Sequence, residues 1–278
     1  MIRTTSRGLL AALLASFTLS LAFSLPAHAN DDMEKIRASG KLTFAVYDDY
    51  APFSGKAGGI DHDLADALAK KLNLKPSLLP FPAGEDISDD LRNMVWKGHY
   101  LGFGPADVML HVPVDRNVMQ KNDKVEIFAP YYRDTVKLVR NVKAIPDLNG
   151  VASLEGKKLG AEKVSISAMV LLGEQSLRDG VNIYVTPIEA LQKLKAGELD
   201  AVVASRSEIE SVIRDDKQFE ITDAPFTRLP RNAWVVGLAV KKENTELALL
   251  LQKAVNDLFD SGEMAALFAK HGVRSIKP

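Results

Sequence analysis

The sequence of 278 residues contains no cysteine. A chain without cysteine has no disulfide, no thiolate metal ligand, no cysteine nucleophile and no attachment point for a c-type haem. Its fold must rest on packing and hydrogen bonding, which a chain of this length permits. The sequence also lacks an excess of either charge, because 35 Lys and Arg oppose 36 Asp and Glu. This balance argues against nucleic acid or another polyanion as the main partner.

The one long apolar run of the sequence lies at its N-terminus. Arg3 and Arg7 precede an apolar and small-residue stretch at residues 9–25, and residues 26–29 (PAHA) have the A-x-A form of a cleavage site. We therefore expect residues 1–29 to be a signal peptide and the mature chain to be periplasmic. That chain would have 249 residues and a net charge of about −3. The alternative is an uncleaved membrane helix.

Beyond residue 40 the apolar pattern predicts strands and helices in alternation. Strands are expected at residues 41–46, 75–81, 106–112, 128–139, 158–162, 182–185, 199–204 and 234–240. Helices are expected at residues 60–74, 88–96, 167–177, 187–196, 246–259 and 262–270, with Asp61, Ser88 and Thr186 as caps. The order strand, helix, strand, helix, strand thus occurs on each side of residue 140, which is typical of α/β sheets. Two such units joined by extended strands predict two lobes with a ligand cleft between them that closes by a hinge motion.

Several short motifs in this order resemble the family 3 solute-binding proteins, the periplasmic partners of polar amino-acid ABC transporters. The motifs are YAPF at residues 50–53, GIDHDLA at 59–65, APYY at 129–132, LEGKKLG at 154–160 and AGELDA at 196–201. The resemblance implies the α/β type II periplasmic binding fold, in which each of two lobes is a mixed sheet flanked by helices. It places lobe 1 at residues 30–135 and 236–278, and lobe 2 at residues 136–235. It further implies a monomer with no cofactor and no catalytic activity.

The residues that hold an amino acid in that family are largely missing from this chain. The arginine that pairs with the ligand carboxylate is displaced to Arg116, and Val112, Pro113 and Val114 stand where hydroxyl residues precede it. Ser205 replaces the aspartate that meets the ligand ammonium, and Arg206 follows it. Arg116 and Arg206 facing each other across the cleft would suit an anionic solute.

A narrower resemblance comes from the glycine-rich segment GHYLGFGPADVMLHVPVD at residues 98–115, with Trp96 just before it. This segment is similar to the MxaJ/XoxJ-type proteins, which are associated with PQQ-dependent methanol dehydrogenases, including lanthanide-using ones. The resemblance implies a periplasmic accessory protein whose partner is the quinoprotein dehydrogenase or its cytochrome c. Under that interpretation Trp96, Tyr100 and Phe103 form an exposed apolar contact surface.

The expected ligand-binding residues combine an aromatic wall with polar groups from both lobes. They are Tyr47, Asp49, Tyr50, Phe53, His111, Arg116, Ser165, Ser205 and Arg206. An oxygen-ligated metal site at Asp48, Asp49, Asp61 and Asp63 is a weaker alternative, because the EF-hand spacing is absent. A dehydratase-like enzyme is another, and it would require Glu126, Glu162 or Glu189 to face His111.

Two functions therefore stay open on the sequence alone. The first is a non-catalytic accessory of a methanol dehydrogenase system. The second is an ABC-transporter substrate-binding protein for a small polar or anionic solute, with a permease as its partner. The sequence names neither the ligand nor the partner.

Overall fold

The computed structural model describes residues 29–227, 229 and 232–278. The predicted signal peptide thus lies outside the described residues, except for its last residue, Ala29. Within the described part of the chain, every helix is too short or too polar to cross a bilayer.

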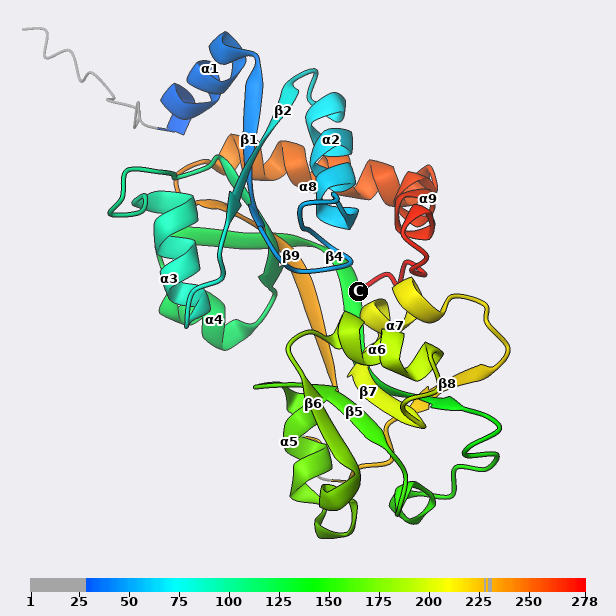
Figure 1. Ribbon diagram of the computed structural model, residues 1–278. Coiled ribbons are helices and arrows are strands. Elements are labelled where there is room, and N and C mark those ends of the chain that lie inside the picture. The colour runs from blue at the N-terminus through cyan, green and yellow to red at the C-terminus, as the bar shows by residue number, and fades with distance from the viewer. Residues whose placement is uncertain (1–28, 228, 230–231) are drawn as a thin grey trace, which may run out of the picture.

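The described residues form two lobes, each an open sheet covered by helices on both faces (Figure 1). The elements of lobe 1 are α1 (Ala29–Ser39), β1 (Lys41–Tyr47), α2 (Ile60–Lys71), β2 (Lys75–Phe81), α3 (Ile87–Leu91), the π-helix η1 (Arg92–Trp96), β3 (Val108–Pro113), α4 (Arg116–Lys121), α8 (Thr245–Asp260) and α9 (Glu263–Lys270). The elements of lobe 2 are the 3₁₀-helix η2 (Val151–Leu154), β5 (Leu159–Glu162), α5 (Ile166–Gly173), the 3₁₀-helix η3 (Gln175–Gly180), β6 (Val181–Tyr184), α6 (Pro187–Lys195), β7 (Ala201–Ser205), α7 (Arg206–Ile213) and β8 (Phe219–Asp223).

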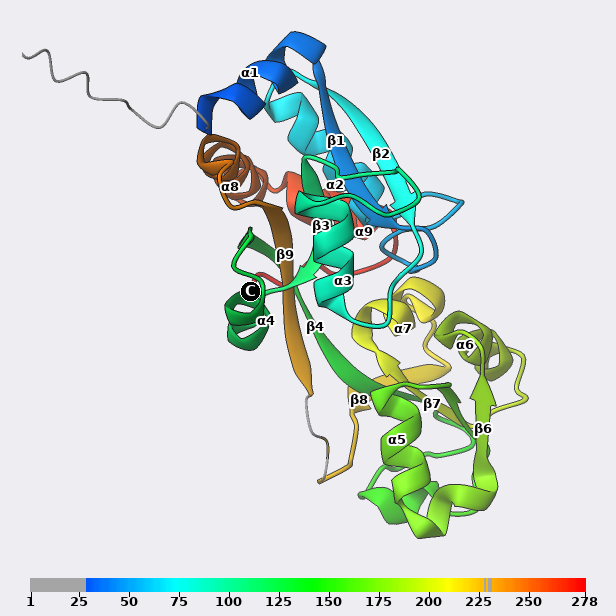
Figure 2. The same cartoon turned by 90° about the vertical axis from the view of Figure 1, so that its left-hand side faces the viewer.

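Two long strands, β4 (Val125–Asn141) and β9 (Ala233–Lys241), connect the lobes. Residues 125–135 of β4 pair with β9, whereas residues 136–141 pair with β7 and β8. The strand order is β2-β1-β3-β9-β4-β7-β5-β6, with β8 also paired to β4. Figure 2 shows β4 and β9 running from one lobe toward the other. The change of partner lies at the predicted lobe boundary, but the boundary residues themselves stay a prediction.

Each lobe has apolar clusters on both faces of its sheet. In lobe 1, Phe44 and Leu110 face α2, α8 and α9, while Met109 and Leu91 belong to a second cluster with η1. Lobe 2 is divided in the same way between two clusters. Trp234 of β9 packs against the cores of both lobes. Burial on both faces explains why most of these strands show continuous apolar runs in the sequence.

The structure corrects several helix boundaries. Gly59, not Asp61, precedes α2, and Asp61 lies fully buried in its first turn. Asp86, not Ser88, caps α3 by accepting the Ser88 backbone N–H. Thr186 caps α6 as expected. The sequence pattern missed five elements, which are α1, α4, η2, α7 and β8.

The two strands that flank β9, β3 and β4, carry irregularities where they pair with it. The register of β3 shifts between Met109 and Val112, and His111 within it has φ +60°. The register of β4 shifts between Phe128 and Tyr132. Bulges of this kind turn side chains out of the regular alternation of a strand. These irregularities explain why the side chains of His111 of β3 and of Tyr131 and Tyr132 of β4 lie at the end of the lobe 1 sheet that is nearer to lobe 2.

Gly237 of β9 lies between these two bulges. A Cβ at this position would lie 2.5 Å from the Phe128 carbonyl oxygen and 2.9 Å from Cγ2 of Val114. Because the nearer obstacle is backbone, it cannot rotate away.

We predict that Gly237→Ala lowers the free energy of unfolding by about 1–3 kcal/mol through overpacking. Urea denaturation measures this. Gly173→Ala is the matched control, because nothing lies within 4 Å of a Cβ there, and alanine suits its helical position. Equal midpoints for Gly237→Ala and the parent chain would contradict the steric explanation.

Candidate ligand site between the lobes

A buried trio of polar side chains lies at the inner end of lobe 1. The Tyr131 hydroxyl donates to Oδ1 of Asp61 at 2.7 Å and accepts the backbone N–H of His111 at 3.1 Å. Nδ1 of His111 is 3.4 Å from Oδ2 of Asp61. All three side chains are almost inaccessible to solvent. Burial and the nearby Asp61 charge raise the pKa of Tyr131, so this hydroxyl stays protonated and donating.

An aromatic wall covers this trio. The His111 ring centroid is 4.2 Å from that of Phe53 and 4.8 Å from that of Tyr50. Residues 50–54 form a tight turn in which the Tyr50 N–H donates to the Ser54 carbonyl at 2.8 Å. This turn buries Phe53 and leaves Tyr50 38% exposed. Tyr50 is therefore the aromatic ring that a ligand can reach.

Carboxyl groups of lobe 2 and of the connecting strand act electrostatically on Tyr50. Desolvation by the surrounding protein atoms raises the pKa of Tyr50, although part of the residue stays exposed, and the charges of Glu208, Asp134 and Glu162 raise it further. These three residues belong to α7, β4 and β5. The charges that act on this phenol thus come from two residues of lobe 2 and one of the connecting strand. We call Tyr50, His111, Asp134, Glu162 and Glu208 the inter-lobe site.

Asp134 fixes the start of α7. Its Oδ1 accepts the backbone N–H of Thr135 at 2.8 Å and that of Ser207 at 3.3 Å, while its Oδ2 accepts the Ser207 hydroxyl at 2.5 Å. Asp134 and Ser207 are both buried. This connection ties the strand that joins the lobes to the helix that carries Glu208.

Glu208 itself closes a capping box with Ser205. The Ser205 hydroxyl accepts the Glu208 N–H, and Oε2 of Glu208 accepts the Ser205 N–H at 2.9 Å. Burial raises the pKa of Glu208 to about 8, with Asp134 and Glu162 adding to the effect. Burial also raises the pKa of Glu162 and of Asp134. The site therefore gathers carboxyl groups that hold their protons more tightly than exposed ones do.

The structure does not bring Arg116 and Arg206 together. Nε of Arg206 donates to Oε1 of the buried Glu210 at 2.6 Å, so its charge is already matched. Arg116 is exposed at the first residue of α4. In both Figure 1 and Figure 2, β4 lies between α4 and α7. The expected arginine pair for an anion is thus absent from the inter-lobe site.

The remaining residues expected to bind a ligand differ in whether their polar groups already have hydrogen-bond partners within the protein. Ser165 caps α5, donating to the Glu162 carbonyl at 2.6 Å and accepting the Ala168 N–H at 3.0 Å. The Tyr47 hydroxyl points to Asp90, with 3.0 Å between the oxygens. Asp49 is exposed in the loop after β1. Among the expected ligand residues, Tyr50 and His111 thus belong to the inter-lobe site. Phe53 packs against His111, and Ser205 bonds Glu208, so these two residues hold members of the site in place.

The expected contact surface of Trp96, Tyr100 and Phe103 is smaller than the sequence suggested. Trp96 and Phe103 pack against the lobe 1 core. Tyr100 and its neighbour Leu101 are 86% and 69% exposed. The ring of His99 stacks on Phe103 at 4.2 Å, which holds the loop closed. The loop therefore turns most of its apolar surface inward.

The carboxylates considered for a metal or for catalysis are dispersed. Asp63 binds Lys270 and His271, whereas Asp61 faces Tyr131. No group of three or more His, Asp or Glu suited to a metal ion occurs among the residues that the structure describes. Glu126 pairs with Lys242, and Glu189 is exposed on α6. Glu162, alone of the three carboxylates considered for catalysis, belongs to the inter-lobe site.

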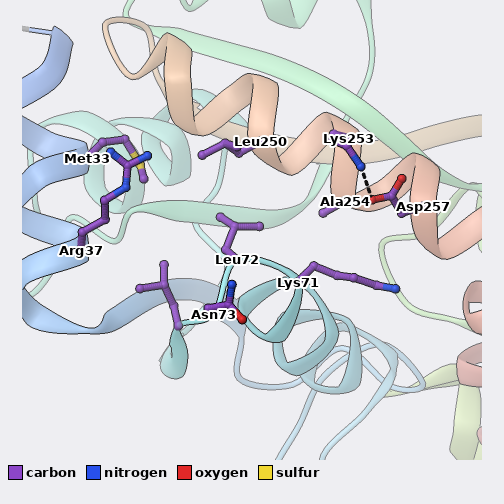
Figure 3. Close-up of a pocket in the computed structure, with 10 residues that line it drawn as sticks. Met33, Arg37, Lys71, Leu72, Asn73, Leu250, Lys253, Ala254 and Asp257 are labelled. Atoms are coloured by element: carbon purple, nitrogen blue, oxygen red, sulfur yellow. Dashed lines mark hydrogen bonds and ion pairs between the residues drawn. The ribbon is translucent and has the colours of Figure 1, made fainter.

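A cavity of about 320 Å³ on lobe 1 lies away from these residues, between α1, α2 and α8 (Figure 3). Its cations are already paired: Arg37 with Glu246, Lys71 with Glu263 and Lys253 with Asp257. With these charges matched, the cavity lacks the cluster of carboxyl groups that the inter-lobe site has.

Sequence reasoning missed Tyr131, Asp134 and Glu208 as site residues. Asp134 could have been noticed as an acid within the otherwise strand-like run YYRDTVKLV. The S-x-x-E spacing of Ser205 and Glu208 is a readable capping-box signal. Tyr131 carries no signal of its own, because its role depends on a partner 70 positions earlier, Asp61.

No family model matches the chain. The ABC transporter glutamine-binding protein GlnH of Bacillus subtilis (strain 168) is 23% identical over 247 residues, covering 86% of this chain and 84% of that protein. Among solved structures, an ancestral cationic amino acid solute-binding protein (AncCDT-1) has a TM-score of 0.67 at 21% identity, covering 87% of this chain and 99% of that chain. An amino acid ABC transporter substrate-binding protein from Streptococcus pneumoniae, AbpA, bound to L-arginine, has a TM-score of 0.56 at 23% identity, covering 86% and 97%.

These likenesses establish the fold. The chain has the type II periplasmic binding protein fold, a mixed α/β architecture with sheets flanked by helices, as the sequence predicted. The two curated relatives are glutamine-binding proteins, and several structural neighbours are amino acid substrate-binding proteins of ABC transporters, while another is a histidine kinase sensor domain. The narrower MxaJ/XoxJ resemblance gains no support from these relatives.

We predict that Tyr131→Phe lowers the free energy of unfolding by about 1–3 kcal/mol, because it leaves buried Asp61 without its hydroxyl donor. Urea denaturation at neutral pH measures the loss. Tyr184→Phe, on a partly exposed strand of lobe 2, is the control and should change little. An unchanged midpoint for Tyr131→Phe would mean that the trio contributes nothing to stability.

Proposed function

We propose that the protein is the solute-binding component of an ABC importer, exported to the periplasm, and that its ligand is a small polar amino acid or amine carrying a positive charge. The observation that carries this proposal is the inter-lobe site, where one partly exposed tyrosine lies within electrostatic range of three carboxyl groups. The relatives named for glutamine, cationic amino acids and arginine support the transport role.

The charges of the site favour a cation. Asp134, Glu162 and Glu208 surround Tyr50, while Arg206 is neutralised by Glu210. An ammonium or guanidinium group against a tyrosine face gains cation–π attraction, and a neighbouring carboxylate adds a charge-assisted hydrogen bond. A bound cation favours the ionised forms of these carboxyl groups, whereas a bound anion opposes their ionisation. Of the small polar or anionic solute expected from the sequence, we therefore keep the polar solute and propose that it carries a positive charge.

The accessory role in a methanol dehydrogenase system is the weaker candidate. It requires an apolar surface for the quinoprotein or its cytochrome c, and the structure exposes Tyr100 and Leu101 there while burying most of Trp96 and Phe103. A solved neighbour of this fold is described as a precursor of cyclohexadienyl dehydratase. Glu162 and His111 lie on opposite sides of Tyr50, yet nothing aligns them as an acid–base pair, so we propose a binding protein rather than an enzyme.

A thermal-shift screen tests the ligand class. We expect arginine, lysine or ornithine to raise the melting temperature most, glutamine to raise it less, and glutamate and succinate not at all. A ligand at a hundred times its dissociation constant adds about 2.7 kcal/mol to the free energy of unfolding. Stabilisation by the dicarboxylates alone would refute the cationic assignment, and no shift with any solute would refute the transport role.

Tyr50→Ala should weaken binding of the ligand found in that screen about tenfold, because a desolvated cation–π contact contributes up to about 2 kcal/mol. Isothermal titration calorimetry measures the dissociation constant. Tyr100→Ala is the matched control, since Tyr100 is exposed on a loop outside the site. Equal affinities for the Tyr50 and Tyr100 variants would remove Tyr50 from the site.

We predict that the affinity for a cationic ligand rises with pH up to about pH 8. The pKa of Glu208 is raised to about 8, so the side chain is protonated at lower pH. A bound cation favours the ionised form, so binding below this pKa releases a proton, and affinity must increase with pH. Glu208→Gln should flatten the profile between pH 6 and 8. An equally steep profile in that variant would assign the dependence to another group.

A further inference from the structure

The C-terminal tail of the chain packs on lobe 1 and contacts α7 of lobe 2 through Arg274. Val273, three residues after the end of α9, is 1% exposed within the lobe 1 core. The next residue, Arg274, contacts α7 of lobe 2. Further along, the Ile276 carbonyl accepts the Arg133 N–H of β4 at 3.3 Å. Figure 1 shows this segment leaving α9 and ending beside β4.

Glu210 of α7 is the point of contact. Its Oε2 accepts the backbone N–H of Arg274 at 2.8 Å, and its Oε1 accepts Nε and Nη2 of the Arg274 side chain at 3.2 and 3.1 Å. The same Oε1 accepts Nε of Arg206 at 2.6 Å. Glu210 is buried, so its carboxylate requires such partners. Of these partners, Arg274 is the one that comes from lobe 1.

The tail packs closely against α7, but a cavity remains between them. A Cβ on Gly272 would lie 3.2 Å from Nε of Arg214, so the tail backbone runs tightly past the end of α7. A cavity of about 420 Å³ nevertheless remains between the tail and α7, lined among others by Glu210, Asp215 and Ala269. The side chain of Arg274 is 78% exposed. Because Glu210 keeps its pairing with Arg206, its contact with Arg274 can break and re-form as the lobes move without leaving the buried carboxylate alone.

We propose that Arg274 and Glu210 form an inter-lobe latch that restricts the angle between the lobes in the absence of ligand. The latch is anchored in the lobe 1 core at Val273 and holds α7, whose first turn carries Ser207 and Glu208. Asp134 binds Ser207 from the connecting strand. Rotation of lobe 2 about β4 and β9 must therefore move Glu210 relative to Arg274. Arg274 is a positioning residue, since it has no contact with the inter-lobe site.

The lack of cysteine makes a direct test possible. Two cysteines introduced as Asp66→Cys on α2 and Gln192→Cys on α6, both exposed, would be the only labelling sites in the chain. Electron–electron double resonance between nitroxides at these positions then reports the distance between lobes without any ligand. The result is independent of whether the proposed transport function is correct.

Arg274→Ala in this background should broaden the distance distribution at least twofold. The fold should survive, because Arg206 still pairs with Glu210 and no buried charge is left alone. Glu210→Gln should broaden it as well, and the double variant should add little, since both changes weaken the same contact between these two residues. Lys277→Ala is the matched control, because Lys277 lies over Phe259 within lobe 1. Distributions for Arg274→Ala and Glu210→Gln as narrow as that of the control would overturn the latch.

Discussion

The pairing of β4 with partners in both lobes is the constraint on which the rest of the structure depends. This strand of 17 residues belongs to the lobe 1 sheet through β9 and to the lobe 2 sheet through β7 and β8. Any residue near the change of partner is held by two cores at once. Tyr131 lies before that point, and Asp134 lies next to it. The polar groups that define the inter-lobe site can therefore be buried without being loosely held.

Burial of acids at this position has an energetic cost that the local contacts offset. Asp134 receives three hydrogen bonds from Thr135 and Ser207, and Glu208 is engaged in a capping box. These bonds favour the charged forms, yet burial outweighs them and raises the pKa of both groups. A cation bound nearby would favour the ionised forms of both groups, which is the physical basis of the proposed preference for a positively charged ligand.

Sequence reasoning was most successful where packing alone decides the structure. The strand at residues 75–81 was predicted with the bounds that β2 has, and Thr186 was assigned correctly as a cap. It failed where a short helix follows a strand directly. The α7 helix has eight residues and begins at the residue after β7 ends, so no turn signal separates them. The missing helix had a further consequence, because Arg206 and Glu210 are four residues apart and form an ion pair only if the segment is helical. Without α7, Arg206 was interpreted as a cation available to a ligand, whereas in the structure it pairs with Glu210.

The overall charge of the chain gives no guidance to the charge of its site. Lysines and arginines nearly balance the acids over 278 residues. Many of the cations, however, are used outside the site: Arg206 and Arg274 share Glu210, Arg140 pairs with Glu220, and Lys270 pairs with Asp63. Among these cations, Arg206 is the first residue of α7, the helix that carries Glu208. Its charge is neutralised by Glu210, which lies one turn further along the helix. The inter-lobe site is therefore acidic because of how the fold distributes its ion pairs, and not because the sequence has acids to spare.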